Sequence, residues 1–147
     1  MKYIHSGHGI YLAQYHIVWC TKYRRRILNP GVASFTRKII LKIVKSLAGV
    51  TVEEMGFDDK LRDHIHLIMI IPPKFSSSDV IAQIKSQSSS QLRKKFPWLA
   101  KVYWKENIVW SPGFFLSTVG VNEKTIKNYV KFQGKQDSGQ TQVNLGL

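Results

Sequence analysis

The chain has 147 residues, a length typical of one domain whose hydrophobic core needs no disulfides. Its 44% apolar content excludes a disordered chain, and no apolar run reaches the roughly 18 residues needed to span a bilayer. Twenty-two Lys and Arg against nine Asp and Glu give a net charge of +13, which favours DNA or RNA as partner, with a basic ribosomal or membrane-surface protein as the alternative.

The first part of the chain predicts a flexible leader, a strand and a helix. Residues 1–10 are polar and contain glycine, whereas residues 11–20 are aromatic and β-branched, as in a strand. The turn signal Asn-Pro-Gly at 29–31 precedes a segment, 32–48, in which apolar residues recur at helical spacing. The first twenty residues lack a signal-peptide core, which predicts a cytoplasmic protein.

The middle of the chain predicts a hairpin followed by a second helix. Residues 50–57 and 62–71 are the two strands, ended by a Pro-Pro pair that cannot donate to a ladder. The Ser-Ser-Ser-Asp cluster at 76–79 is an N-cap signal for a helix that continues to about residue 95.

The last part of the chain predicts one more strand and one more helix. Residues 108–119 form the strand, and Asn122 caps a helix that continues to about residue 135. Residues 137–147 form a mobile polar tail. The order β-α-β-β-α-β-α indicates an α+β fold, an antiparallel sheet with helices on one face, close to the ferredoxin-like or split βαβ plan, plus a C-terminal helix. We expect one domain over residues 11–136.

Two histidines lie one residue apart on the apolar strand 62–71. Side chains at i and i+2 of a strand project from one face, so His64 and His66 can reach the same divalent ion while apolar residues anchor the other face. Hydrogen-bonded surface histidines would produce the same pattern. Imidazole with oxygen ligands suits Mn²⁺ or Mg²⁺, whereas a closed zinc site would need more protein ligands.

Tyr129 and Gln133 lie four residues apart on the predicted last helix and therefore share a face. Gln133 offers an amide oxygen as a further metal ligand. Tyr129 offers a nucleophile that conserves the energy of a phosphodiester in a phosphotyrosine, although a tyrosine that simply packs its ring is the ordinary alternative. The sequence has no phosphate-binding loop, so no nucleotide cofactor is expected.

These residues and several further motifs resemble the compact single-tyrosine transposases of insertion sequences, which carry the HUH motif (His, hydrophobic, His). The resemblance covers residues 11–136. It is carried by the Asp-His-Ile-His-Leu motif at 63–67, the Trp-Cys-Thr-Lys-Tyr-Arg-Arg run at 19–25, Trp-Ser-Pro at 110–112, Ser-Thr-Val-Gly at 117–120 and the segment from Tyr129 to Gln133.

The resemblance implies a homodimer whose sheets join across the two-fold axis and which recognises hairpins in single-stranded DNA at the ends of a mobile element. It implies cleavage through a 5′-phosphotyrosine with a free 3′-OH, assisted by Mg²⁺ or Mn²⁺. Tyr129 would be the nucleophile of a C-terminal catalytic helix, and His64, His66 and Gln133 the metal ligands. The helix can pair with the partner subunit's histidines, and DNA binding would bring the protein to the nucleoid.

Two basic clusters are candidates for phosphate contacts. They comprise Lys22, Arg24, Arg25 and Arg26, and then Arg93, Lys94 and Lys95. The chain departs from the family pattern at 85–90, where a glycine and an arginine are missing, and at Val121, where many relatives have a second glycine.

Two alternatives remain open. A non-catalytic RNA- or DNA-binding module on a similar sheet would explain the charge and would tolerate the loss of His64. A domesticated transposase with a cellular role would keep the same chemistry. The tryptophans at 98, 104 and 110 could stack on unpaired bases or pack in the core.

Overall fold

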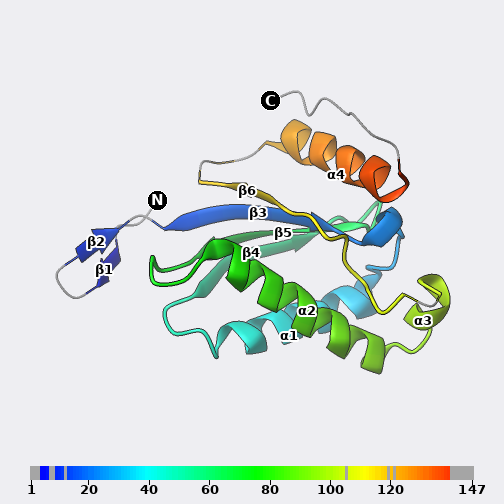
Figure 1. Ribbon diagram of the computed structural model, residues 1–147, viewed down its shortest axis with the longest axis horizontal. Helices are drawn as coiled ribbons and strands as arrows, with labels where there is room; N and C mark the ends of the chain where they lie inside the picture. The colour runs from blue at the N-terminus through cyan, green and yellow to red at the C-terminus, as the bar shows by residue number, and fades with distance from the viewer. Residues whose placement is uncertain are drawn as a thin grey trace.

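A computed structural model describes residues 4–6, 9–11, 13–104, 106–118, 120 and 122–139 (Figure 1). Its centre is a four-stranded sheet in the order β4-β5-β3-β6, in which all neighbouring strands are antiparallel. The strands are β3 (Gln14–Cys20), β4 (Thr51–Phe57), β5 (His64–Ile70) and β6 (Phe115–Ser117). The predicted α+β class with an antiparallel sheet is therefore confirmed.

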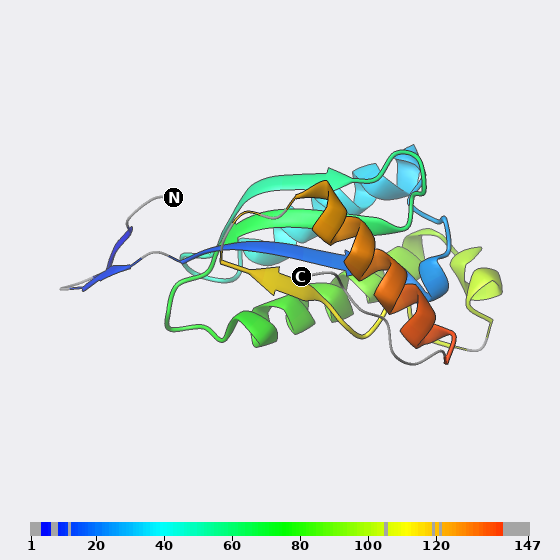
Figure 2. The ribbon, with the colours of Figure 1, turned by 90° about the horizontal axis from the view of Figure 1, so that it is seen from above.

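Helices cover both faces of the sheet. Two long helices, α1 (Pro30–Val44) and α2 (Ser77–Lys95), lie side by side on one face, and α4 (Glu123–Asp137) crosses the opposite face obliquely (Figures 1 and 2). The main core fills the space between the sheet and the α1–α2 layer. A smaller apolar cluster lies beneath α4. None of the helices in the described part of the chain combines the length and apolar composition of a membrane span.

The helix starts are those that the sequence signals indicate. The side chains of Asn29, Ser76 and Asn122 accept hydrogen bonds from backbone N–H groups of the first turns of α1, α2 and α4. Each of these oxygens satisfies a donor that the helix itself cannot satisfy.

Three regions differ from the sequence-based expectation. Within the predicted leader, β1 (Ile4–Ser6) and β2 (Gly9–Tyr11) form an antiparallel hairpin that projects from the body of the protein (Figure 1). The predicted strand 108–119 is only β6 and an isolated bridge at Trp110, because the intervening loop contacts side chains instead of a strand. Val119 itself lies outside the described residues.

Two short helices and the end of α4 were not anticipated. They are η1 (Lys22–Arg24), where Tyr23 and Arg24 have positive φ, and α3 (Leu99–Val102). Asp137, which the sequence suggests as the start of the tail, is the last residue of α4 and its side chain is buried. Of the predicted tail, residues 140–147 lie outside the described residues.

Candidate active site

The two histidines lie on the inner strand β5, which is hydrogen-bonded on both sides. Alternation along the strand buries Ile65, Leu67 and Met69 in the main core and leaves His64 and His66 half-buried on the opposite face. This is the face that α4 crosses. The imidazoles are therefore fixed on the sheet by the burial of the residues between and after them.

Asp63 orients the first histidine. Its Oδ1 lies 2.8 Å from Nδ1 of His64, and its Oδ2 accepts a hydrogen bond from Nε of Arg24 at 3.0 Å. Burial by itself would raise the pKa of the Asp63 carboxyl, but the hydrogen bonds from His64 and Arg24 outweigh burial and hold that pKa below its usual range. With Nδ1 turned to a carboxylate, His64 keeps Nε2 for a metal ion.

Gly56 makes room for the second histidine. It pairs directly with His66 across β4 and β5, and a Cβ at Gly56 would lie 2.2 Å from Cε1 of the imidazole. The ring therefore packs against the bare backbone of β4, where a glycine inside a strand permits close approach. Its Nε2 is 3.9 Å from a carboxylate oxygen of Glu54.

The sheet and α4 bring the remaining predicted site residues to the same face. Tyr129 and Val130 of α4 pack on Val18 and Cys20 of β3. In the β3–β5 register Val18 pairs with His66 and Cys20 pairs with His64, and side chains of directly paired residues share a face. Tyr129 on α4 and the histidines on β5, more than 60 positions apart in the sequence, thus lie on the same face of the sheet.

Tyr129 and Gln133 form one buried unit on α4. The Tyr129 hydroxyl donates to Oε1 of Gln133 at 3.4 Å, and its ring lies 5.8 Å from that of Phe115. Burial, and then the nearby Cys20 and Asp137, raise the pKa of the Tyr129 phenol. The phenol is therefore protonated at neutral pH in this arrangement.

The loop after Trp110 closes over this unit. A Cβ at Gly113 would lie 2.5 Å from Oε1 of Gln133 and 3.5 Å from the Tyr129 oxygen. The buried ammonium of Lys85 on α2 fixes the loop, because it donates to the carbonyls of Ser111 at 2.6 Å and Gly113 at 2.7 Å. Burial lowers the pKa of Lys85 to about 8, although Cys20 and Asp137 act to raise it. Lys85 thus holds the loop that lies against Tyr129 and Gln133.

The donors on this face fit a divalent cation. His64 and His66 offer imidazole nitrogens and Gln133 offers an amide oxygen, which are donor types found around divalent cations in proteins. Asp58, Asp63 and His64 also lie within 4.8 Å of one another. However, Asp58 accepts hydrogen bonds from the backbone of the β4–β5 turn and Asp63 is paired with Arg24, so both carboxylates are already engaged.

The basic residues divide into paired and exposed side chains. Lys22 lies 3.5 Å from Asp137, and Arg24 is paired with Asp63, whereas Arg25 and Arg26 are exposed. On α2, Arg93 donates to the carbonyl of Ile108.

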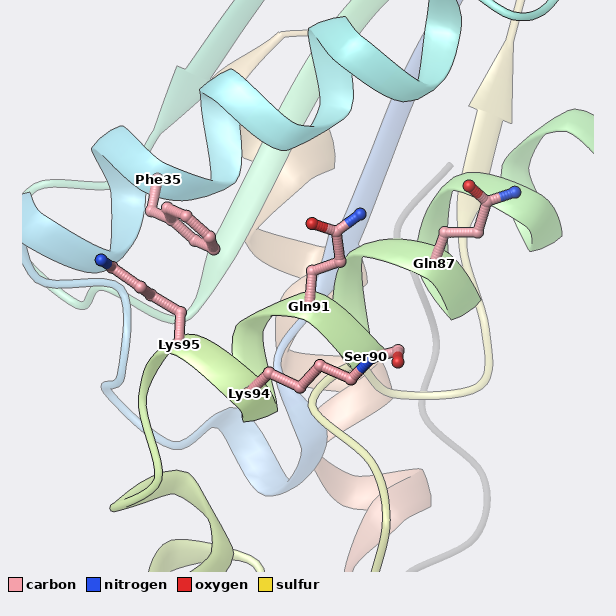
Figure 3. Close-up of a pocket in the computed structure, with 6 residues that line it drawn as sticks. All are labelled: Phe35, Gln87, Ser90, Gln91, Lys94 and Lys95. Atoms are coloured by element: carbon pink, nitrogen blue, oxygen red, sulfur yellow. The ribbon is translucent and has the colours of Figure 1, made fainter.

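Lys94 and Lys95 line a surface pocket between α1 and α2. Figure 3 shows Lys95 turned toward Phe35, with its ammonium 5.7 Å from the ring centroid, and Lys94 turned toward Ser90. The glutamines of α2 at 87 and 91 complete the lining. This polar, cationic groove lies on the face of the sheet opposite α4.

The three tryptophans considered for base stacking, at 98, 104 and 110, differ in exposure. Trp110 is buried, donates to Ser88 and packs edge-on against Trp19, so it belongs to the core. Trp98 is 39% exposed beside Phe96, and Trp104 is 73% exposed. Only Trp104, of these three, presents most of its surface to solvent.

Four residues around the site were not singled out by the sequence. Asp63 adjoins the histidine motif, and the interior-strand position of Gly56 is a signal of close packing. Gly113 and Asp137 give no such signal, because their partners come from distant segments of the chain.

Comparisons with known proteins show which family the chain is similar to. The family described as Transposase IS200 like matches residues 9–133. The chain is 30% identical over 132 residues to the ISDra2 transposase TnpA of Deinococcus radiodurans, covering 87% of this chain and 89% of that protein. It is 32% identical over 144 residues to the transposase for insertion sequence element IS200 of Salmonella typhimurium, covering 95% and 88%.

Solved structures share the fold. A putative transposase from Deinococcus radiodurans aligns with a TM-score of 0.73 at 26% identity, over 90% of this chain and 98% of that one. A REP-associated tyrosine transposase bound to a REP hairpin aligns with a TM-score of 0.51 at 17% identity, over 92% and 73%, which is a likeness of fold alone. Because the family model matches residues 9–133 and two relatives at 30% and 32% identity are matched over most of their length, the chain belongs to the IS200-like family of HUH single-tyrosine transposases.

Proposed function

We propose that the protein cuts and rejoins single strands of DNA beside hairpins, with Tyr129 as the nucleophile. The observation that carries the proposal is the meeting of the tyrosine helix and the two histidines on one face of the sheet, through the paired residues Val18–His66 and Cys20–His64. A nucleic-acid-binding module has no need of this convergence.

In the proposed reaction the Tyr129 oxygen attacks the scissile phosphorus. The phenol gives its proton to water as the O–P bond forms, and the 3′ oxygen leaves with the electrons of the broken P–O bond and takes up one proton from water, which gives a 5′-phosphotyrosine and a free 3′-OH. Attack by a 3′-OH on that linkage reverses the step and rejoins strands without ATP.

We propose His64, His66 and Gln133 as ligands for Mg²⁺ or Mn²⁺. When bound, the cation polarises the scissile phosphate and stabilises charge on the leaving oxygen. Asp63 holds His64 in the orientation that frees Nε2, and Gly56 lets the His66 ring approach the backbone of β4 closely.

Tyr129 is only 4% exposed in this arrangement, so a phosphate cannot reach its hydroxyl without a displacement of α4. We infer a homodimer in which α4 leaves its own sheet during the reaction and pairs with the partner subunit's histidines. The sheet edges available for joining two copies are β4 and β6.

DNA binding is supported by charge and by a structural relative. The REP-associated transposase is bound to a hairpin. In this chain Arg25 and Arg26 are exposed next to η1, and Lys94 and Lys95 line the α2 groove (Figure 3). We propose that these cations contact phosphates and that Trp104 stacks on an unpaired base. DNA as substrate implies action in the cytoplasm, at the nucleoid.

The test is covalent capture of DNA. Purified protein, Mn²⁺ and labelled single-stranded DNA from the flanks of its own gene should give an adduct that survives denaturing electrophoresis. Tyr129→Phe should abolish the adduct and keep hairpin binding, whereas Tyr15→Phe, which alters a tyrosine packed against the main core, should keep both.

An adduct that survives in Tyr129→Phe would exclude this nucleophile. Binding that needs no metal, tolerates His64→Ala and never gives an adduct would favour the non-catalytic module.

A further inference from the structure

Asp137 ends α4 with a carboxylate that is almost completely buried, its side chain being 2% exposed. Its Oδ2 accepts from the backbone N–H of Tyr23 at 2.9 Å. Its Oδ1 accepts from the Ser111 hydroxyl at 3.0 Å and from Nε2 of Gln133 at 3.2 Å, and the Lys22 ammonium lies 3.5 Å away. The proposed reaction assigns no role to this carboxylate, although every group directed at it is a donor.

The contact with Gln133 decides which end of the amide faces the site. A carboxamide has a donor end and an acceptor end, whereas an ionised carboxylate only accepts. The Nε2 of Gln133 must therefore face Asp137, which leaves Oε1 on the opposite side, toward the Tyr129 hydroxyl. Only the Oε1 end can ligate a cation.

The arrangement repeats on α4 what Asp63 does on the sheet. On the sheet, Asp63 contacts the Nδ1 of His64 and accepts a hydrogen bond from Arg24. On α4, Asp137 accepts a hydrogen bond from the Nε2 of Gln133. It also accepts hydrogen bonds from the Tyr23 N–H and the Ser111 hydroxyl. Carboxylates behind metal ligands fix ligand orientation, and their loss typically weakens metal binding about 10- to 100-fold.

We propose that Asp137 is a positioning residue, which holds the Gln133 carboxamide with Oε1 directed at the divalent cation. The inference rests on the proposed role of Gln133 as a metal ligand. Asp137 and Gln133 lie one turn apart on α4, so a movement of the helix carries both residues together.

The test uses Mn²⁺ alone as the probe, without DNA. Mn²⁺ affinity is measured from the loss of the free-ion electron paramagnetic resonance signal in titrations of the full chain. Asp137→Asn keeps the size of the side chain but offers one acceptor oxygen in place of two. When that oxygen accepts from the Tyr23 N–H, the NH2 group faces Gln133 and favours the reversed amide. We expect Mn²⁺ binding at least 10-fold weaker, and recovery of adduct formation when Mn²⁺ is raised.

A double-mutant cycle shows whether the effect passes through Gln133. Gln133→Ala should weaken Mn²⁺ binding, and Asp137→Asn added to it should cause no further loss. If Gln133→Ala leaves Mn²⁺ affinity unchanged, the proposed ligand is wrong. If Gln133→Ala weakens Mn²⁺ binding but Asp137→Asn does not, the positioning role is wrong. It is also wrong if Asp137→Asn weakens Mn²⁺ binding by the same factor in the wild type and in Gln133→Ala.

Lys135→Gln is the control, since it changes an exposed side chain in the same last turn of α4 and leaves the contact between Asp137 and Gln133 in place. We expect a change in Mn²⁺ affinity below 3-fold. A loss as large as that of Asp137→Asn would mean that general packing at the end of α4, and not the amide orientation, is responsible, and would overturn the proposal. Thermal unfolding of each variant verifies that it is folded.

Discussion

The two halves of the candidate site are held by different forces. The histidines lie on β5, an inner strand with backbone hydrogen bonds on both sides and three buried side chains beneath it. The tyrosine and glutamine lie on α4, which is attached by a small apolar cluster and by hydrogen bonds at its end. Backbone ladders in the core open only with global unfolding, whereas a helix docked by few side chains can separate alone. The histidine half is thus a fixed platform, and the α4 half is held by fewer contacts.

The sharpest test of this difference compares one truncation in each half. Ile65→Ala should lower the free energy of unfolding by about 3 kcal/mol, because it leaves a cavity in the main core. Val130→Ala should instead chiefly speed amide exchange along α4, since Val130 packs only in the small cluster. Urea denaturation and hydrogen exchange read by mass spectrometry measure the two effects. Equal acceleration of β5 and α4 exchange by both variants would show that the halves open together.

A side chain added at Gly56 should disturb the histidine half of the site, because the His66 ring already occupies that space. In Gly56→Ala the added methyl would overlap the His66 ring, so the imidazole must turn away. We expect Mn²⁺ affinity and adduct formation to fall about 100-fold, the upper end of losses from disturbed ligand orientation. Gly31→Ala, whose Cβ meets only Asn29 at 3.5 Å, is the control and should change neither. Unchanged Mn²⁺ affinity in Gly56→Ala would remove His66 from the metal site.

Lys85, which fixes the loop over α4, predicts a pH dependence. Its pKa is about 8 in the folded protein against an ordinary 10.5, so between these values the unfolded chain binds the extra proton and stability rises with pH. The free energy of unfolding of the wild type relative to Lys85→Met should therefore increase by about 2 kcal/mol from pH 7 to pH 10. Parallel urea titrations of the two proteins measure it. If the difference in free energy of unfolding between the two proteins stays constant or falls as the pH rises, Lys85 does not have a lowered pKa in the folded protein.

The smallest expected effect concerns the exposed cations beside the site. Replacing Arg25 and Arg26 together by glutamine should weaken hairpin binding about 5-fold and lower the slope of log K against log salt by about 1 to 1.5. Lys42→Gln with Lys45→Gln, on the exposed side of α1, is the charge-matched control. Fluorescence anisotropy at several salt concentrations gives both numbers. Equal losses in both pairs would indicate a diffuse electrostatic attraction without local phosphate contacts.

Local signals in the sequence determined β3, β4, β5, the long helices and the family. The side-chain alternation along 63–71 places both histidines on one strand face, and the cap residues define where α1, α2 and α4 begin, because these are interactions between near neighbours. The spacing of Tyr129 and Gln133 likewise needs only a helix. The roles of these residues in catalysis and metal binding stay predictions.

Only the tertiary structure decided what surrounds those residues. That α4 lies over β3 opposite α1 and α2, that Asp63 and Asp137 stand behind His64 and Gln133, and that Lys85 fixes the loop at Gly113 are contacts between distant segments. No periodicity encodes such contacts, since they depend on strand order and on the packing of the whole core. For the same reason Lys22 and Arg24, which read as free phosphate contacts in the sequence, are ion-paired within the fold.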